Sequence, residues 1–408
     1  MTKAEIFSKI NSLEQEIIQT LADLIALPSV TPFNGGDGEM AKAVYLQDRA
    51  FKLGLGTGER YDAVDPDGNI RPNLVFSVPG KTKRRLWIVS HMDVVPEGDR
   101  SLWKTDPFKA VIEDGKVIGR GSSDNLQELV SSLYALVALR QLNIEPEYEI
   151  CLAFVADEEM GSRYGIVHLI EQKLFRPDDL LYVPDMGSES GDLVEVAEKS
   201  GLWVEFTVRG KQVHASMPQL GLNACRIANE LSVALDHALH AAFPEADDLF
   251  APNISTFEPT RREKNVPNIN TVPGSETFCF DCRVLPSVDL KDVEAVIKEE
   301  SDKVSAKTGA EISWSFPNYN PAAEPTPVDC DAYQLISAAV SEVLNVKVRA
   351  IGIGGGTCAA FFRKEGIPAI VWGQEQDVAH MPNEYAKIEY ILNETKVFAL
   401  MMAGYKPV

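Results

Sequence analysis

The spacing of apolar residues along the chain follows two periods. Stripes with helical spacing, such as Ile10, Ile17 and Leu21, alternate with short runs rich in β-branched and aromatic residues. Strands that alternate with helices are typical of an α/β sheet, and Asp114-Gly115 between two such runs predicts a hairpin and hence a mixed sheet. The elements expected before residue 199 are helices 4–27, 39–53 and 125–137 and strands 73–78, 86–90, 108–112, 116–118, 148–155 and 180–184.

The pattern changes near Lys199, where strand-like runs begin to alternate polar and apolar residues. The order βαββαβ predicts a separate two-layer α+β domain, followed by a proline-rich exit linker at 317–328 and a return to the α/β rhythm. The expected elements of this region and the remainder are strands 202–208, 268–272, 276–284, 311–316, 347–353 and 367–372 and helices 223–239, 290–307, 331–344, 357–365 and one from about 383.

We therefore expect an α/β domain with a mixed central sheet flanked by helices, formed by residues 1–199 and 317–408. Residues 200–316 are expected to form an inserted α+β domain, which is suited to act as a lid. Active sites often lie at such domain junctions.

Three acids follow the predicted strand 148–155 directly: Asp157, Glu158 and Glu159. Like charges this close repel one another, and buried carboxylates need a cation or a shifted pKa. The cluster therefore predicts a divalent metal site in which one carboxylate holds metal and a neighbour transfers protons.

Other candidate ligands also occur where predicted strands end. His91 and Asp93 follow the strand 86–90 and are expected to share a face, so Asp93 can accept the second ring N–H of His91. Asp185 follows the strand 180–184, and His380 lies in a polar loop after the strand 367–372. A polar strand end facing solvent and a plain surface histidine are the alternatives for these positions.

Asp124 has two interpretations. It can cap a helix that starts at Asn125, with Gln127 completing a capping box, or it can bridge two metal ions. In open α/β sheets ligands bind at the rim where all these residues fall. Two histidines and three carboxylates suit two zinc-type ions that share a bridging carboxylate.

Composition narrows the classes of partner. The formal net charge of −21 argues against nucleic acid and anionic membrane surfaces, and no apolar run approaches the roughly 18 residues of a membrane span. The N-terminus lacks a signal peptide's apolar core, and six scattered cysteines indicate a reducing cytoplasm. Cys279 and Cys282 are expected on opposite faces of a strand, which argues against a zinc knuckle there.

Taken together, these motifs resemble the M20 metallopeptidase and amidohydrolase family, which includes succinyl-diaminopimelate desuccinylase, acetylornithine deacetylase, aminoacylase and carboxypeptidase G-type enzymes. The segments that carry the resemblance span nearly the whole chain and are Ser90–Pro96, Trp103 with Asp106–Phe108, Gly119–Asp124, Asp157–Ser162, Pro184-Asp185 and Ala379–Pro382.

The resemblance implies a role for each candidate. It assigns one divalent ion, zinc in preference to cobalt or manganese, to His91, Asp124 and Asp185. A second ion is implied at Asp124, Glu159 and His380, so that Asp124 bridges the two ions. Glu158 is implied as general base and acid, and Asp93 as the residue that orients His91.

The inserted segment is similar to the family's lid and dimerisation domain, which implies a homodimer. The implied substrate contacts are His214, Asn270, Arg283, Gly355, Gly356 and Thr357. A guanidinium suits a substrate carboxylate, but Arg283 could equally pair with a local acid, and His214 could be a structural loop residue.

We therefore predict a metal-dependent hydrolase that cleaves the amide bond of an N-acyl amino acid, with desuccinylases and deacetylases as the nearest branch. The alternatives are a dipeptidase or carboxypeptidase acting on short peptides, and a non-catalytic metal-binding homologue.

Overall fold

The computed structural model describes residues 2–405, which fold into two compact units. The first consists of the chain up to Val196, Thr326–Ile351 and the chain from Thr357 on. The second consists of Ala197–Pro325 and Gly352–Gly356. No helix among residues 2–405 is long and apolar enough to cross a membrane.

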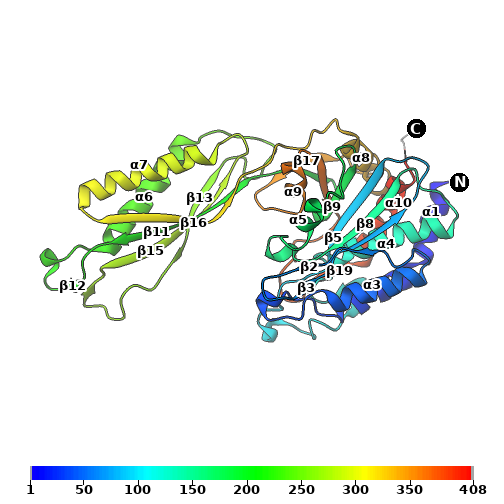
Figure 1. The fold of residues 1–408 in the computed structure, drawn as a ribbon, viewed down its shortest axis with the longest axis horizontal. Helices are drawn as coiled ribbons and strands as arrows, with labels where there is room; N and C mark the ends of the chain where they lie inside the picture. Colours follow the sequence, from blue (N-terminus) through cyan, green and yellow to red (C-terminus); the bar gives the residue numbers. More distant parts are fainter. Residues whose placement is uncertain (1, 406–408) are drawn as a thin grey trace. The chain divides into compact units, whose positions relative to one another are not determined.

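The first unit is built on a mixed central sheet (Figure 1). The order of its strands is β1-β4-β8-β5-β9-β18-β10-β17. Its strands are β1 Glu59–Arg60, β4 Leu74–Val78, β5 Arg85–His91, β8 Glu149–Val155, β9 Leu180–Gly187, β10 Leu193–Glu198, β17 Arg349–Ile353 and β18 Ala369–Gly373. The helices of the unit are α1 Lys3–Ser12, α2 Glu14–Ile25, α3 Met40–Lys52, α4 Leu126–Gln141, α5 Ile166–Glu171, α8 Asp331–Leu344, α9 Ala359–Lys364 and α10 Ile388–Met402.

Three neighbouring strands in the middle of the sheet, β8, β5 and β9, run parallel. All seven residues of β5 are buried, and alternate residues such as Trp87 and Val89 pack with Ile166 of α5 and Phe362 of α9. Because parallel strands place their carboxyl ends at the same edge, the segments that follow β5, β8 and β9 meet there.

The predicted fold class is confirmed, but three details of the first unit were wrong. The expected helix 4–27 is two helices, because Leu13 leaves the helical conformation directly after Asn11 and Ser12, residue types that favour helix ends. The hairpin forms, with positive φ at Asp114 and Gly115, yet its strands β6 Val111–Glu113 and β7 Lys116–Ile118 join β19 Tyr385–Lys387 in a separate small sheet.

The central sheet is mixed for a different reason. Strand β4 pairs antiparallel with β8, and β10, which was not predicted, pairs antiparallel with β18. The remaining short elements are β2 Ala63–Val64, β3 Ile70–Arg71 and the 3₁₀ turns η1 Pro32–Asn34, η2 Arg100–Leu102 and η3 Glu158–Met160.

The second unit is an antiparallel sheet in the order β13-β15-β11-β16 with α6 and α7 on one face (Figure 1). Its elements are β11 Ser200–Arg209, β12 Val213–His214, η4 Pro218–Leu220, α6 Ala224–Ala242, β13 Thr256–Arg262, β14 Thr271–Val272, β15 Ser275–Val284, α7 Leu290–Thr308 and β16 Glu311–Asn320. Strand β15 buries every second residue, so Cys282 is buried while Cys279 lies on the other face, as predicted.

The expected order βαββαβ is present, but its second strand was misplaced. It is β13, not the run 268–272, of which only Thr271 and Val272 form a short strand. Pro259 argued against a strand at this position, because proline is disfavoured inside sheets. It is tolerated in β13 because β13 is an edge strand. The predicted limits 200–316 fall inside this unit, and the roles assigned to the two units stay predictions.

Candidate metal centre

The candidate ligands of the first unit come from the carboxyl edge of the central strands. His91 is the last residue of β5, Asp185 lies near the end of β9, and η3 follows β8 after a turn at Asp157. Asp157 adopts a left-handed conformation with φ 67°, and its backbone carbonyl accepts from Ser162 N at 2.7 Å. This tight turn projects Glu158 and Glu159 from the end of a buried strand.

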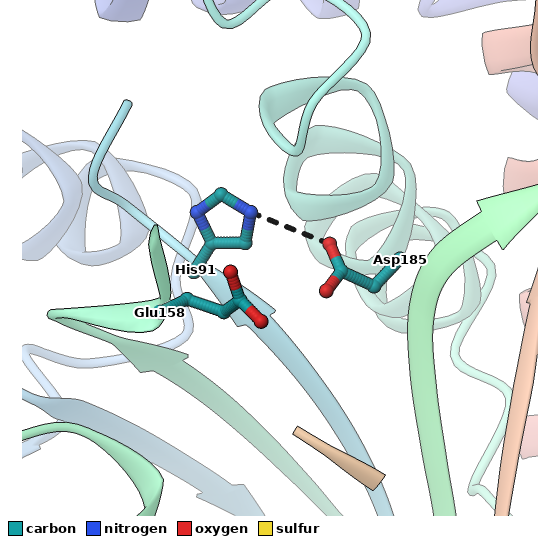
Figure 2. A group of neighbouring side chains, drawn as sticks. All are labelled: His91, Glu158 and Asp185. Carbon is teal, nitrogen blue, oxygen red and sulfur yellow. Dashed lines mark ion pairs between the residues drawn. The ribbon is translucent and has the colours of Figure 1, made fainter. Parts of the chain in front are cut away.

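Residues 2–405 contain two groups of side chains whose donor atoms lie within 4.8 Å of one another. One group is His91, Glu158 and Asp185, which point toward a common centre in Figure 2, and the other is Asp124, Glu159 and His380. The structure thus brings together all five predicted ligands and the predicted base.

Asp124 connects the two groups. Its Oδ1 lies 2.9 Å from His91 Nε2, and its Oδ2 lies 3.1 Å from His380 Nε2. The alternative role as a helix cap is wrong, because α4 starts one residue later than expected, with Asn125 as its N-cap and no side-chain capping bond. Each carboxylate oxygen of Asp124 faces a different histidine, which is the arrangement a bridging ligand requires.

Each histidine nitrogen also faces a second carboxylate. His91 Nε2 lies 3.3 Å from Asp185 Oδ1, and His380 Nε2 lies 3.1 Å from Glu159 Oε2. One N–H can satisfy only one such oxygen, whereas a cation among these atoms attracts all of them. Mixed nitrogen and oxygen donors at this spacing fit divalent ions of the zinc type.

Asp93 lies beside His91, but differently from the expectation. His91 Nδ1 lies 2.9 Å from the backbone carbonyl of Asp93 and 3.6 Å from its carboxylate. That carboxylate accepts instead from the backbone N–H groups of Glu158 and Glu159, each at 3.1 Å. Asp93 therefore links His91 to the two glutamates.

Burial is the largest influence on two acids of the centre, Glu158 and Asp185. It raises the pKa of Glu158 well above the ordinary range, and the carboxylates of Asp185, Asp93 and Glu159 add to this rise, whereas His91 opposes it. Burial also raises the pKa of Asp185 to about 6, against the opposing effect of His91. Buried acids with shifted pKa values are typical of functional sites.

Three supporting residues were missed in the sequence. Asn125 accepts from His91 N at 3.1 Å and donates to Asp185 Oδ1 at 3.0 Å, so it joins the ends of β5 and β9. Arg71 is fully buried, pairs with Glu39 and donates to Asp157 Oδ1 at 3.1 Å, which holds the turn before Glu158. Their partners lie far away in the sequence, so no local pattern assigns them.

The predicted substrate contacts form a second set, and most lie in the second unit. His214 and Asn270 meet where β12 pairs with β14, and Ala215 N donates to Asn270 O at 2.8 Å. His214 is exposed, and its Nδ1 accepts from Ser216 N at 3.1 Å. A neutral imidazole with Nδ1 as acceptor carries its proton on Nε2.

Arg283 is engaged within its own unit. Its Nε and Nη2 donate to the two carboxylate oxygens of Asp281 at 2.6 and 3.0 Å, and its Nη1 donates to Gly354 O at 2.9 Å. The local acid that was left open as a partner is therefore present. Gly355 and Gly356 follow in the same loop, and Thr357 Oγ1, in the first unit, accepts from Ala359 N at 3.1 Å at the start of α9.

Comparison with known proteins identifies the family. Residues 87–404 match the pattern of Peptidase family M20/M25/M40. The chain belongs to this family. It is therefore a metallohydrolase, and the family implies a dinuclear metal site and substrates that are peptides or amino-acid derivatives.

Individual proteins are similar to this chain over nearly its whole length. The chain is 40% identical over 95% of its length to an uncharacterized metallohydrolase of Methanocaldococcus jannaschii, of which it covers 98%. It is 27% identical over 90% of its length to succinyl-diaminopimelate desuccinylase of Rickettsia bellii, of which it covers 91%. Its fold is similar to that of human carnosine dipeptidase 1, with a TM-score of 0.76, 19% identity and coverage of 99% and 98% of the two chains.

Proposed function

We propose that the protein hydrolyses the amide bond of an N-acyl amino acid, in the manner of a desuccinylase or deacetylase, with two divalent ions, zinc in preference to cobalt or manganese. The observation that carries the proposal is the position of Asp124, whose two oxygens lie 2.9 and 3.1 Å from the Nε2 atoms of His91 and His380. His91, Asp124 and Asp185 hold one ion, and Asp124, Glu159 and His380 hold the other.

When bound, such ions polarise an amide carbonyl and lower the pKa of a water molecule. Glu158 then removes the water proton through a carboxylate oxygen and delivers it to the leaving nitrogen. The raised pKa of Glu158, caused first by burial, suits a group that must accept a proton and release it again. Asp93 fixes the backbone of both glutamates, so Glu158 and Glu159 keep their different roles.

The second unit supplies most of the substrate contacts in this proposal, and Thr357 of the first unit supplies one more. His214 donates from Nε2 to the developing oxyanion, and Asn270, Arg283, Gly355, Gly356 and Thr357 bind the substrate's free carboxylate and backbone. A homodimer through this unit and a reducing cytoplasmic location complete the proposal. Six free cysteines support the location.

A hydrolysis screen tests the proposal directly. The protein is stripped of metal with a chelator, loaded with Zn²⁺, Co²⁺ or Mn²⁺, and offered N-succinyl amino acids, N-acetyl amino acids and dipeptides. We expect turnover only after loading and a preference for an N-acyl substrate. A preference for dipeptides would favour the peptidase alternative, and binding of two ions without any turnover would favour the non-catalytic homologue.

A further inference from the structure

A second buried ion pair lies beside the metal centre and has no role in the chemistry described above. Arg120 and Glu384 are 2% and 0% exposed, and Arg120 Nη1 donates to Glu384 Oε2 at 2.6 Å. Arg120 belongs to the turn before Asp124, and Glu384 lies four residues after His380. The guanidinium also lies over the ring of Trp103, with Arg120 Cζ 5.3 Å from the ring centroid.

The carboxylate of Glu384 fixes the backbone that carries Asp124. Its Oε1 accepts from Ser123 N at 2.9 Å and from Asp124 N at 3.1 Å, and its Oε2 also accepts from Gly121 N at 3.0 Å. Four donors therefore converge on one carboxylate, and three of them are backbone N–H groups of the loop that ends at Asp124.

The guanidinium of Arg120 contacts the backbone that carries the second histidine, His380. Its Nη2 donates to His380 O at 3.2 Å and lies 3.4 Å from Pro96 O. One ion pair thus contacts the backbones of both Asp124 and His380. No strand end holds His380, which sits in a loop with a side chain 55% exposed, whereas the side chain of His91 at the end of β5 is 2% exposed.

A buried ion pair is poor evidence for added stability, because desolvation of two charges offsets most of their attraction. Its value lies in fixed geometry, and the residues behind metal ligands orient those ligands. We propose that Arg120 and Glu384 act as positioning residues that set the separation of Asp124 and His380, and thereby the affinity of the second metal subsite. This inference rests on the proposed dinuclear function.

Glu384→Gln tests the inference. A glutamine amide nitrogen cannot accept a hydrogen bond. In either orientation of the amide, its NH₂ group would therefore face N–H donors that the carboxylate of Glu384 now accepts from. We expect this variant to keep one tightly bound Zn²⁺, while its second Zn²⁺ binds about 10- to 100-fold more weakly in calorimetric titration of the stripped protein. Excess Zn²⁺ should restore much of the lost kcat. If the substitution only damaged the fold, excess Zn²⁺ would not restore it.

Asp179→Asn is the matched control. Asp179 is 4% exposed and likewise accepts from four donors, namely Arg85 Nε, Arg85 Nη2, Trp87 Nε1 and Arg176 N. It lies at the amino ends of β5 and β9, opposite the metal centre. We expect a similar fall in Tm but two Zn²⁺ bound with wild-type affinity.

The outcomes separate the two proposals. Unchanged affinity for the second Zn²⁺ in Glu384→Gln overturns the positioning role alone. Wild-type protein that binds two Zn²⁺ but hydrolyses no substrate overturns the proposed function alone, and wild-type protein that binds fewer than two overturns both. Should Glu384→Gln not fold, Arg120→Lys decides by the same titration, because lysine keeps the charge but cannot contact Glu384 and His380 O together.

Discussion

The residues proposed for function are held very differently in the two units. In the first unit they are largely buried and contact one another, as His91 does with Asp124 at 2.9 Å and with Asp185 at 3.3 Å. In the second unit His214 and Asn270 are exposed, and Arg283 donates to Asp281 and Gly354 of the same unit. The first unit brings the side chains proposed for metal binding and proton transfer together in one cluster. The second unit presents separate side chains that form no such cluster with one another.

This difference separates two kinds of effect. Changes in the first unit should abolish metal binding or proton transfer, because the fold of that unit alone determines the geometry. Changes in the second unit should reduce transition-state or substrate binding and leave the metal content intact.

The largest effect is expected for Glu158→Gln. Glutamine keeps the shape but cannot accept a proton, so kcat should fall by about 10²- to 10⁴-fold with two Zn²⁺ still bound. Steady-state kinetics and elemental analysis on the same sample measure both quantities. The metal content matters because Glu158 lies within ligand distance of His91 and Asp185. Loss of an ion together with activity would make Glu158 a ligand and refute its role as base.

A smaller effect is expected from the second unit for His214→Ala. Removal of one donor to an oxyanion typically lowers kcat by about 10²- to 10³-fold, and the metal content should not change. His237→Ala, at an exposed position of α6 in the same unit, serves as control and should retain wild-type kcat. A His214→Ala enzyme with full kcat would reduce His214 to a loop residue held by Ser216.

The same contrast explains what could be predicted from sequence. His91, Asp185 and the Asp157 turn could be found because each directly follows an apolar run, and strand ends in α/β sheets converge on one rim. Asp124 could not be resolved, since a carboxylate before a helix is equally a cap, and only its contacts with two histidines decide between the two.

The supporting residues could not be predicted for a physical reason. Glu384 and Arg120 are 264 residues apart in sequence, and Arg71 and Asp157 are 86 apart. Charge pairing across such separations leaves no local periodicity. In the second unit Arg283 could be placed on a strand. The sequence alone does not reveal whether its guanidinium binds Asp281 or a substrate carboxylate, because the two compete for the same donors.

The smallest effect is expected for the competition between Asp281 and a substrate carboxylate for the guanidinium of Arg283. Arg283→Ala should raise KM for substrates with a free carboxylate by about threefold to tenfold, less than for a dedicated arginine, because binding substrate means leaving Asp281. Asp281→Asn should act in the opposite direction and lower KM, since it frees the guanidinium, while kcat and metal content stay unchanged in both variants. The measurement is KM for one N-acyl amino acid and for its carboxamide, on which neither change should act. If Asp281→Asn instead raises KM, the pair serves to hold Gly354 in place, and the second unit contributes Arg283 as a positioning residue for the glycine-rich loop.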